Sequence, residues 1–254
     1  MAFGAVIIGD EILSGRRQDK HLSKLIELLA ARGLQLSWAR YCGDERPRLI
    51  ELLQQTMATG DIVFSFGGIG ATPDDHTRQC AAIAAGVDLC LHPDAEAAIR
   101  ARFGAETTPL RLRLGEFPVG SRVIPNPYNR IPGFALGTHH FLPGFPEMAW
   151  PMAEWVLDNW FAQLHHTHPH CEQSILVFEA REGELISFME ALEAQHPVTI
   201  FSLPSLSTPS QRGHIELGAK GEADVVERVM AEIRAEMSRR GYEWVAAQDT
   251  RPAA

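Results

Sequence analysis

The stretch from Asp61 to Cys80, DIVFSFGGIGATPDDHTRQC, constrains the fold more than any other part of the chain. Ile62 to Phe66 is a short apolar run, which is typical of a strand buried on both faces of a parallel sheet. Three glycines follow it: Gly67, Gly68 and Gly70. Thr72 and Pro73 then have the chemistry of a helix start. The stretch therefore predicts a strand, a glycine loop and a helix in immediate succession.

Two interpretations of this loop stay open. In the first, Thr72 is the N-cap residue and Asp75 the N3 carboxylate of a capping box, while Asp74 also favours the positive end of the helix dipole. In the second, backbone amides freed by the glycines bind an anion, and a cation lies between that anion and the two carboxylates. Because capping alone does not need three glycines, we favour a site that combines phosphate, divalent metal and carboxylate.

The composition excludes several classes of partner. The chain of 254 residues has a formal net charge of −9 and a sequence pI of about 5.6, so no nucleic acid and no membrane partner is expected. Four cysteines without C-x-x-C spacing are typical of a reducing compartment, and we expect a cytoplasmic protein. The first apolar run lacks a basic segment before it and is expected to be a strand rather than a signal peptide.

Acidic residues also follow the two strands expected before this stretch. The first predicted strand, residues 5–8, ends in Gly9, Asp10 and Glu11, and the second is followed by Asp44. Open α/β sheets bind ligands at the carboxyl ends of their strands. One solvated acidic turn is ordinary, but three turns at the same edge of a sheet form a cluster. We therefore expect these turns to converge on one site.

The rest of the first domain is expected to be helical and loop-rich. Residues 123–155 hold prolines next to glycine or asparagine, which is typical of rigid loops that serve a site. Residues 108–117 alternate between leucine and charge but begin with Thr108 and Pro109, so we favour a helix there over a strand. The other expected helices lie at residues 47–59, 93–103 and 147–160.

The run LHHTHPHC, residues 164–171, marks a shift in composition and is expected to be a linker between domains 1–165 and 166–254. Its histidines lack the spacing of a tetrahedral metal site. Residues 218–221, GAKG, match the GXXG loop of RNA-binding KH domains. That loop joins two helices, however, whereas this one is expected to join a strand to a helix. The second domain is expected to be α+β, with strands at 174–180, 198–203 and 212–217 and helices at 184–194 and 222–239.

Four blocks of sequence carry a resemblance to a known family. They are GDEILSG at 9–15, GDE at 43–45, GGIGATPDDHT at 67–77, and NPYNRIPGF through LPGFPEM at 126–148. Together they resemble the MoaB/MogA-type molybdopterin-binding domain in the form found in CinA-like, competence-damage-inducible proteins. The resemblance implies an α/β domain with a mostly parallel sheet and helices on both faces, followed by a small α+β KH-like domain.

The resemblance also implies a chemistry. The family's transferase branch moves an adenylyl group to molybdopterin, and its CinA-like branch cleaves a pyrophosphate linkage such as that of ADP-ribose or FAD with a divalent metal. We expect the second activity, with Mg, Mn or Co as cofactor and a small-molecule nucleotide or pterin as ligand. Adenylyl transfer, a binding module without turnover, and a homo-oligomer stay open.

The resemblance further implies roles for individual residues. Asp44 and Asp75 match the family's essential acids and are the expected metal ligands, and Asp74 joins them as a third catalytic candidate. The expected ligand- and phosphate-binding residues are Gly9, Asp10, Glu11, Gly67, Gly68, Gly70, Thr72, Thr77, Asn126, Gly133, Gly144 and Glu147.

The chain departs from the family pattern in three places. Ala71 replaces the usual proline before the threonine, and Asp19 and Lys20 replace a common Thr-Asn pair. These changes are consistent with a binding module. Residues 166–254 resemble the small KH-like domain rather than the amidase domain of full-length CinA, so we do not expect deamidation. Arg78 and Arg130 are further candidates for a phosphate contact, although we favour a solvated side chain for each.

Overall fold

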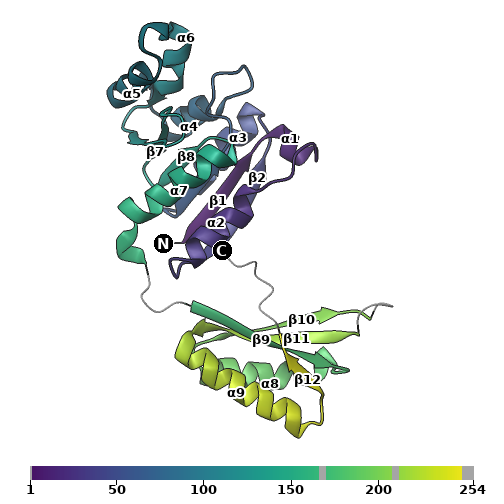
Figure 1. Ribbon diagram of the computed structural model, residues 1–254. Helices are drawn as coiled ribbons and strands as arrows, with labels where there is room; N and C mark the ends of the chain where they lie inside the picture. Colours follow the sequence, from purple (N-terminus) through teal and green to yellow (C-terminus); the bar gives the residue numbers. More distant parts are fainter. Residues whose placement is uncertain (1, 166–169, 208–211, 248–254) are drawn as a thin grey trace. The chain divides into compact units, whose positions relative to one another are not determined.

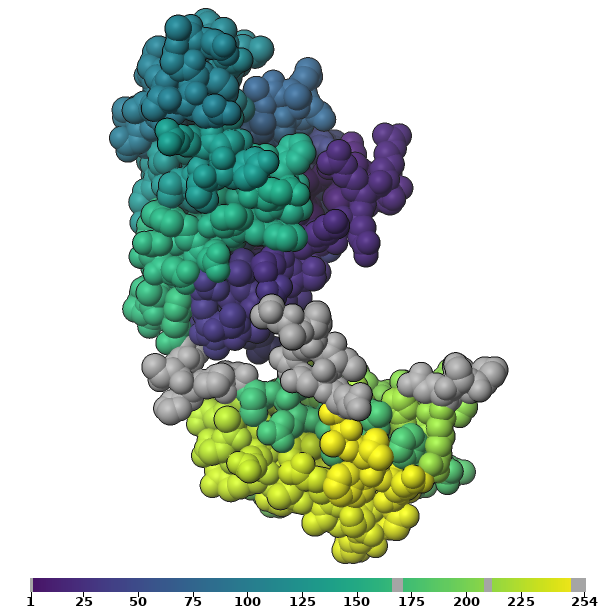
Figure 2. Space-filling view, in the orientation of Figure 1, coloured from purple at the N-terminus to yellow at the C-terminus, as the bar shows by residue number. Residues whose placement is uncertain are grey.

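The computed structural model describes residues 2–165, 170–207 and 212–247 (Figure 1). The chain divides into two compact units, residues 1–165 and 166–254. Figure 2 shows the first unit in purple to teal, with the segment around residues 93–115 forming a lobe that projects from it. Within the described ranges, no helix combines the length and the apolar character that crossing a membrane requires.

The first unit alternates strands and helices. Its strands are β1 (Phe3–Ile8), β2 (Leu36–Cys42), β3 (Ile62–Phe66), β4 (Leu89–Leu91), β5 (Glu116–Pro118), β6 (Arg122–Ile124), β7 (Gly133–Leu136) and β8 (His139–Leu142). Its helices are α1 (Asp10–Leu13), α2 (His21–Ala30), α3 (Arg46–Met57), α4 (Thr77–Ala85), α5 (Pro93–Phe103), α6 (Pro109–Leu112) and α7 (Pro146–Trp160).

The main sheet has six strands in the order β2-β1-β3-β8-β7-β6. The first four are parallel, and β7 and β6 pair antiparallel at one edge. The parallel register places Ile8 beside Cys42, Ile7 beside Phe66, and Phe66 beside Leu142. The four parallel strands therefore end at the same edge, and the loops that follow them meet there. The strands β4 and β5 form a separate ribbon.

The sheet of the first unit separates two hydrophobic cores. Alternate residues of β1 face opposite sides because side chains on a strand alternate, so Ile7 joins one core and Ile8 the other. Helices α2 and α7 cover the first core, and α3 and α4 cover the second. The predicted fold class, a mostly parallel sheet with helices on both faces, is confirmed.

Most element boundaries agree with expectation, and α5 spans the predicted residues. The predicted helix at 108–117 is correct only at its start. Thr108 accepts a hydrogen bond from the Arg111 N–H at 3.3 Å and caps α6, which begins at Pro109. A 3₁₀ turn follows, and then β5, because the buried Phe117 pairs with Cys90 in β4. Tertiary pairing thus overrides the helical signal at the end of the segment.

The capping interpretation of the glycine loop is wrong about where the helix starts. Helix α4 begins at Thr77, and its N-cap residue His76 makes no side-chain capping bond. The Asp75 N–H donates to the Thr72 carbonyl at 3.0 Å, and the Asp75 carboxylate accepts from the Thr72 N–H at 2.9 Å and from the Thr72 hydroxyl. The Thr72–Asp75 pair therefore closes a separate turn ahead of the helix.

The second unit is an antiparallel sheet covered by two helices. Its elements are β9 (His170–Phe178), α8 (Glu182–Gln195), β10 (Thr199–Ser205), β11 (His214–Glu222), α9 (Ala223–Arg239) and β12 (Trp244–Ala246). The strand order is β10-β11-β9-β12. Val226, Val229 and Ile233 of α9 pack on Val177 and Leu217 of the sheet. The expected α+β architecture is present.

The second unit differs from expectation in two places, and part of a third expectation concerns residues that the structure does not describe. Residues 218–221 are not a loop, because they belong to β11, where residues 218–220 pair with both β9 and β10 and Gly221 pairs with β9. This placement removes the likeness to a GXXG loop. The three-residue strand β12 was not expected. Residues 166–169 of the histidine-rich run lie outside the described residues.

Two buried histidines occupy β8. The His139 Nε2 lies 2.9 Å from the Thr56 hydroxyl, which itself donates to backbone carbonyls of α3, so His139 donates this hydrogen bond. The His140 ring stacks on Phe64 with centroids 5.1 Å apart. Burial lowers the pKa of His139 from 6.5 to about 4 and that of His140 to about 3. Both rings are therefore neutral in the folded protein.

We expect the first unit to lose stability as the pH falls from about 6.5 to 4, because the unfolded chain then binds protons on both histidines and the folded chain does not. This stability is fully present above pH 6.5. Each histidine contributes a slope of about 1.4 kcal/mol per pH unit. His140→Phe keeps a ring on Phe64 and removes one titration, so its Tm should fall less steeply over this range. Identical slopes for variant and wild type would contradict the assignment.

Candidate functional site

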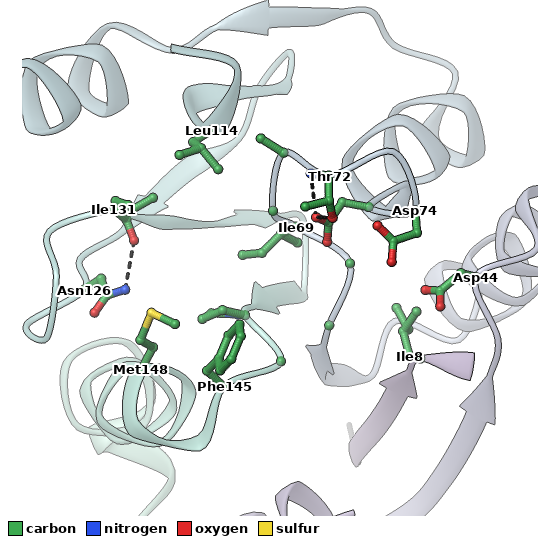
Figure 3. A pocket seen from close by; sticks show the side chains of 18 of the residues that line it. Ile8, Asp44, Ile69, Thr72, Asp74, Leu114, Asn126, Ile131, Phe145 and Met148 are labelled. Atoms are coloured by element: carbon green, nitrogen blue, oxygen red, sulfur yellow. Dashed lines mark hydrogen bonds between the residues drawn. The ribbon is translucent and has the colours of Figure 1, made fainter. Parts of the chain in front are cut away.

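A cavity of about 400 Å³ opens at the carboxyl edge of the parallel strands (Figure 3). The loops after β1, β2, β3 and β8 line it, together with the loop between β6 and β7 and the end of the α5–α6 lobe. Eleven of the residues expected from the sequence line this pocket: Gly9, Glu11, Asp44, Gly67, Gly68, Gly70, Thr72, Asp74, Asp75, Asn126 and Gly144.

The glycine loop turns its carbonyls away from the pocket. The Gly67 carbonyl accepts from the Thr77 hydroxyl at 3.0 Å, and the Gly68 carbonyl accepts from the Thr77 N–H at 3.0 Å. The Gly70 carbonyl accepts from the Arg78 guanidinium. Thr77 and Arg78 are both buried. Gly67 and Gly68 adopt φ angles of 110° and 67°, which favour glycine and allow this reversal.

The amides of the same loop are free. Within the described residues, the N–H groups of Gly68, Ile69, Gly70 and Ala71 donate to no backbone or side-chain acceptor. Unpaired backbone donors that follow one another along a tight loop form a concave anion site. Because its carbonyls are bonded to Thr77 and Arg78 and its amides are free, the loop has the polarity that a phosphate group requires.

Asp44 faces this loop from the end of β2. The Asp10 N–H donates to Asp44 Oδ2 at 3.0 Å, and the Asp44 N–H donates to Asp10 Oδ1 at 3.2 Å, so the loops after β1 and β2 are held together. Burial raises the pKa of Asp44, and the negative charges of Asp10, Glu11 and Asp74 raise it further. Asp44 therefore sits in a negative field that a bound cation would relieve.

Asp74 and Asp75 occupy different environments. Figure 3 shows the carboxylates of Asp74 and Asp44 on the same side of the pocket, pointing toward one another. The nearby Thr72 side chain and the backbone N–H of Asp74 itself lower the pKa of the exposed Asp74 carboxyl. The Asp75 Oδ2 atom accepts hydrogen bonds from Thr72. A Cβ placed on Gly70 would lie 2.3 Å from the same oxygen, so glycine is needed at position 70 for the two to pack this closely. Asp75 therefore holds the shape of the loop, with Oδ1 left over.

The carboxylates fit an ion shared with a ligand better than an ion held by protein alone. Across the described ranges, no three His, Cys, Asp or Glu side chains come together as a metal cage. Mg²⁺ is usually held by one or two carboxylates together with substrate phosphates, and carboxylate oxygen also suits Mn²⁺. Asp44 and Asp74 meet this requirement. The choice of Asp75 as the second metal ligand is untested, and because Thr72 occupies its Oδ2 we favour Asp74 in that role.

Four expected ligand-binding residues lie outside the pocket. Asp10 and Thr77 shape its loops through the hydrogen bonds already described. Gly133 is buried in β7, where an added Cβ would lie 2.5 Å from the Phe141 carbonyl oxygen. Glu147, in the first turn of α7, lines a separate hollow with Lys24 and Trp150. Sequence position alone does not separate residues that form a loop from residues that face a ligand.

The arginines differ from expectation. Arg78 is 3% exposed, and burial lowers the pKa of its guanidinium, so the solvated interpretation is wrong for this residue. Arg130 is exposed and does not line the pocket. Among the pocket residues, all of which lie in described parts of the chain, Arg17 is the one basic side chain. Sequence reasoning missed it, although it lies only two residues after the GDEILSG block.

His21 is a second residue that sequence reasoning missed. It is 6% exposed, its Nε2 lies 3.1 Å from the Gly144 carbonyl, and its ring stacks on Phe66 with centroids 4.6 Å apart. The first residue of α2 thereby fixes the turn after β8, which lines the pocket. The signal in the sequence is weak, because a histidine two residues after Asp19 has the appearance of an exposed first turn.

A mostly parallel α/β sheet with a glycine loop of free amides and acidic turns at its carboxyl edge has the arrangement in which open α/β domains bind their ligands. Residues 4–163 match the family model described as a probable molybdopterin binding domain. The chain therefore belongs to the molybdopterin-binding domain family, and its first unit is of the CinA-like, MoaB/Mog type.

Individual relatives agree with this assignment. A CinA-like protein of Anaeromyxobacter dehalogenans is 35% identical over 164 residues, covering 61% of this chain and 40% of the relative. A putative competence-damage inducible protein of Alkaliphilus metalliredigens is 30% identical over 210 residues, covering 76% of this chain and 49% of the relative. The chain thus spans less than half the length of these curated relatives. The crystal structure of CinA from Thermoplasma acidophilum, a protein of unknown function, is 28% identical with a TM-score of 0.57, covering 63% of this chain and 98% of that one.

Proposed function

We propose that the first unit is a divalent-metal-dependent pyrophosphatase that acts on dinucleotide-type substrates of the ADP-ribose or FAD class. One observation carries the proposal. The free amides after Gly67 and the carboxylates of Asp44 and Asp74 line the same pocket. An amide cradle binds one phosphate group, and an acidic pair beside it requires a cation before a second phosphate can approach.

Each group of pocket residues has a different role in the proposed reaction. The loop amides bind one phosphate of the substrate, and Asp44 and Asp74 are the residues that would hold Mg²⁺, Mn²⁺ or Co²⁺. When bound, the ion neutralises the charge that develops on the diphosphate. Asp75, which keeps Oδ1 free, accepts a proton from the attacking water. Arg17 adds a positive charge to the pocket wall.

The reaction is a hydrolysis of a phosphoanhydride. Water attacks one phosphorus, the bond from that phosphorus to the bridging oxygen breaks, and the bridging oxygen leaves with the other phosphate. ADP-ribose and water thus give AMP, ribose 5-phosphate and released protons. Preorganised donors and charges that stabilise this charge redistribution are worth about 10²–10³ in rate for each group.

Ligand-dependent stabilisation separates this proposal from simpler alternatives. With Mg²⁺, ADP-ribose at a hundred times its dissociation constant should add about 2.7 kcal/mol to the free energy of unfolding, and EDTA should remove most of this gain. The measurement is the Tm of the first unit across a panel of nucleotides and pterins. Stabilisation without product release would favour a binding module, and no stabilisation by any diphosphate would contradict the proposal.

A further inference from the structure

The pocket has a second, apolar half opposite the acidic one. Figure 3 shows Leu114, Ile131, Phe145 and Met148 on one side and Asp44 and Asp74 on the other. Pro132 and Pro143 complete the apolar wall. If the diphosphate of the proposed substrate lies at the acidic half, whatever group it carries extends along this wall.

The polar side chains on the apolar side are already occupied. Asn126 is 5% exposed, and its Nδ2 donates to Asn129 Oδ1 at 2.8 Å and to the Ile131 carbonyl at 2.9 Å. Its Oδ1 accepts from the backbone N–H groups of Tyr128 at 3.0 Å and Asn129 at 3.4 Å. A primary amide has two donor hydrogens and two acceptor lone pairs. The Asn126 side chain therefore has nothing left for a ligand.

Asn129 is almost as fully used. Its Oδ1 accepts from Asn126 Nδ2 and from the Ile131 N–H at 2.9 Å, and its Nδ2 donates to the Met148 sulfur at 2.9 Å. One N–H of this amide stays unused. The Phe145 carbonyl accepts from the N–H groups of Met148 and Ala149, so this acceptor is occupied as well.

Phe145 is the aromatic side chain of the wall. It is 55% exposed and directly precedes α7. In the described parts of the chain it forms no contact with another aromatic ring or with a cation above its face. An exposed aromatic face at the mouth of a pocket is a stacking surface for a planar ring.

We infer that the apolar half of the pocket binds the heterocyclic ring of a diphosphate-linked ligand by its face, with Phe145 as the stacking surface, and does not read its edge. The site therefore selects the diphosphate and accepts different bases. This inference rests on the proposed function for the position of the diphosphate. It adds that adenine is not required.

Weak selectivity among bases is expected because the Asn126 amide and nearly all of the Asn129 amide are already hydrogen-bonded within the protein. A site that hydrogen-bonds a specific group rejects analogues by about 10⁴–10⁵, whereas apolar contacts discriminate by only about 10–200-fold. The one side-chain N–H that remains, on Asn129, does not discriminate between rings, because adenine, guanine, uracil, pterin and flavin all present acceptors. Stacking is tolerant for the same reason, since every ring has a π-face.

The test uses ADP-glucose, GDP-glucose and UDP-glucose, which differ only in the base, and inorganic pyrophosphate, which has none. Dissociation constants come from Tm titrations of the full chain with Mg²⁺. We expect the three nucleotides to bind within about tenfold of one another. Phe145→Ala should weaken all three by a similar factor, roughly five- to hundredfold for the loss of a base stack, and should leave pyrophosphate binding unchanged.

Tyr128→Ala is the matched control. It removes an aromatic side chain that is 66% exposed and does not line the pocket, so nucleotide affinity should stay within about twofold of wild type. A preference of a thousandfold or more for one base, or unchanged nucleotide affinity in Phe145→Ala while pyrophosphate still binds, would overturn the inference. Because the readout is binding, nucleotides that bind in this pattern without hydrolysis would refute the pyrophosphatase and support the ring site.

Discussion

Asp44→Asn should lower the rate at which the pyrophosphate linkage of ADP-ribose is cleaved with metal by about 10² or more, and it should leave the first unit at least as stable as the wild type. The rate falls because the variant removes one of two charges proposed to hold the ion. Stability is kept because an asparagine oxygen still accepts the hydrogen bond from the Asp10 N–H. The free energy of unfolding should rise where the neutral side chain relieves the cost of burial and the repulsion from Glu11 and Asp74, because burial and these charges raise the pKa of Asp44. The measurements are the initial rate at several metal concentrations and the Tm.

Two further variants, a control outside the pocket and a second variant within it, help to interpret this result. Asp88→Asn removes the same charge from an exposed side chain outside the pocket and should change neither rate nor metal dependence. Asp75→Asn keeps an acceptor for the Thr72 N–H, so its stability should change by about 1 kcal/mol or less. Its rate should fall while its affinity for the metal stays near that of wild type. A well-folded Asp44→Asn protein with full activity would remove Asp44 from the site.

Gly67→Ala should destabilise the first unit by about 3 kcal/mol or more and abolish diphosphate binding. The added Cβ would lie 2.2 Å from the Ile8 carbonyl oxygen, which is backbone and cannot rotate away. The φ angle of 110° adds strain for any residue with a Cβ. Relief requires the ends of β1 and β3 to separate, and this movement displaces the loop amides. Urea unfolding and a Tm titration with pyrophosphate measure the two effects.

Gly120→Ala isolates the backbone part of this effect. Gly120 has a φ angle of 88°, and a Cβ placed there meets nothing within 4 Å. This variant therefore bears only the conformational cost, about 1–2 kcal/mol, and should bind pyrophosphate as the wild type does. Equal losses of stability in the two variants would show that contact with Ile8 does not matter.

The sheet of the first unit was predictable because its strands carry strong local signals. The apolar runs of β1 and β3 are buried on both faces, and each is followed by glycine. The parallel order brings the turns after these strands together, as expected from chains of this class. Burial, glycine and chain order all favour the same arrangement, so the location of the pocket followed from the sequence.

The start of α4 was not predictable from local chemistry. Thr72, Pro73 and Asp75 have the residue types of a helix start, but the same hydrogen-bonding groups also close a turn. The choice depends on Thr77, whose hydroxyl and N–H are needed by the carbonyls of Gly67 and Gly68. That demand exists only after the loop has folded over β3. Local pattern therefore identified the loop and misplaced the helix.

Roles within the pocket also depend on contacts between distant residues. Asn126 lines the pocket, as expected, but its amide is occupied by its own loop. Arg78 resembles a surface side chain in the sequence, yet it lies buried against the carbonyl of Gly70. Hydrogen-bond occupancy and burial are properties of the folded chain, so residue type alone does not reveal them.

The central claim is that the pocket hydrolyses a pyrophosphate linkage with the help of a divalent metal. The most direct measurement is the release of AMP from ADP-ribose by the purified chain with Mg²⁺, Mn²⁺ or Co²⁺, compared with the same reaction in EDTA and with Asp44→Asn. The account predicts metal-dependent release of AMP and ribose 5-phosphate in equal amounts, with loss of activity in EDTA and in the variant. AMP at the level of the protein-free control with all three metals would contradict it.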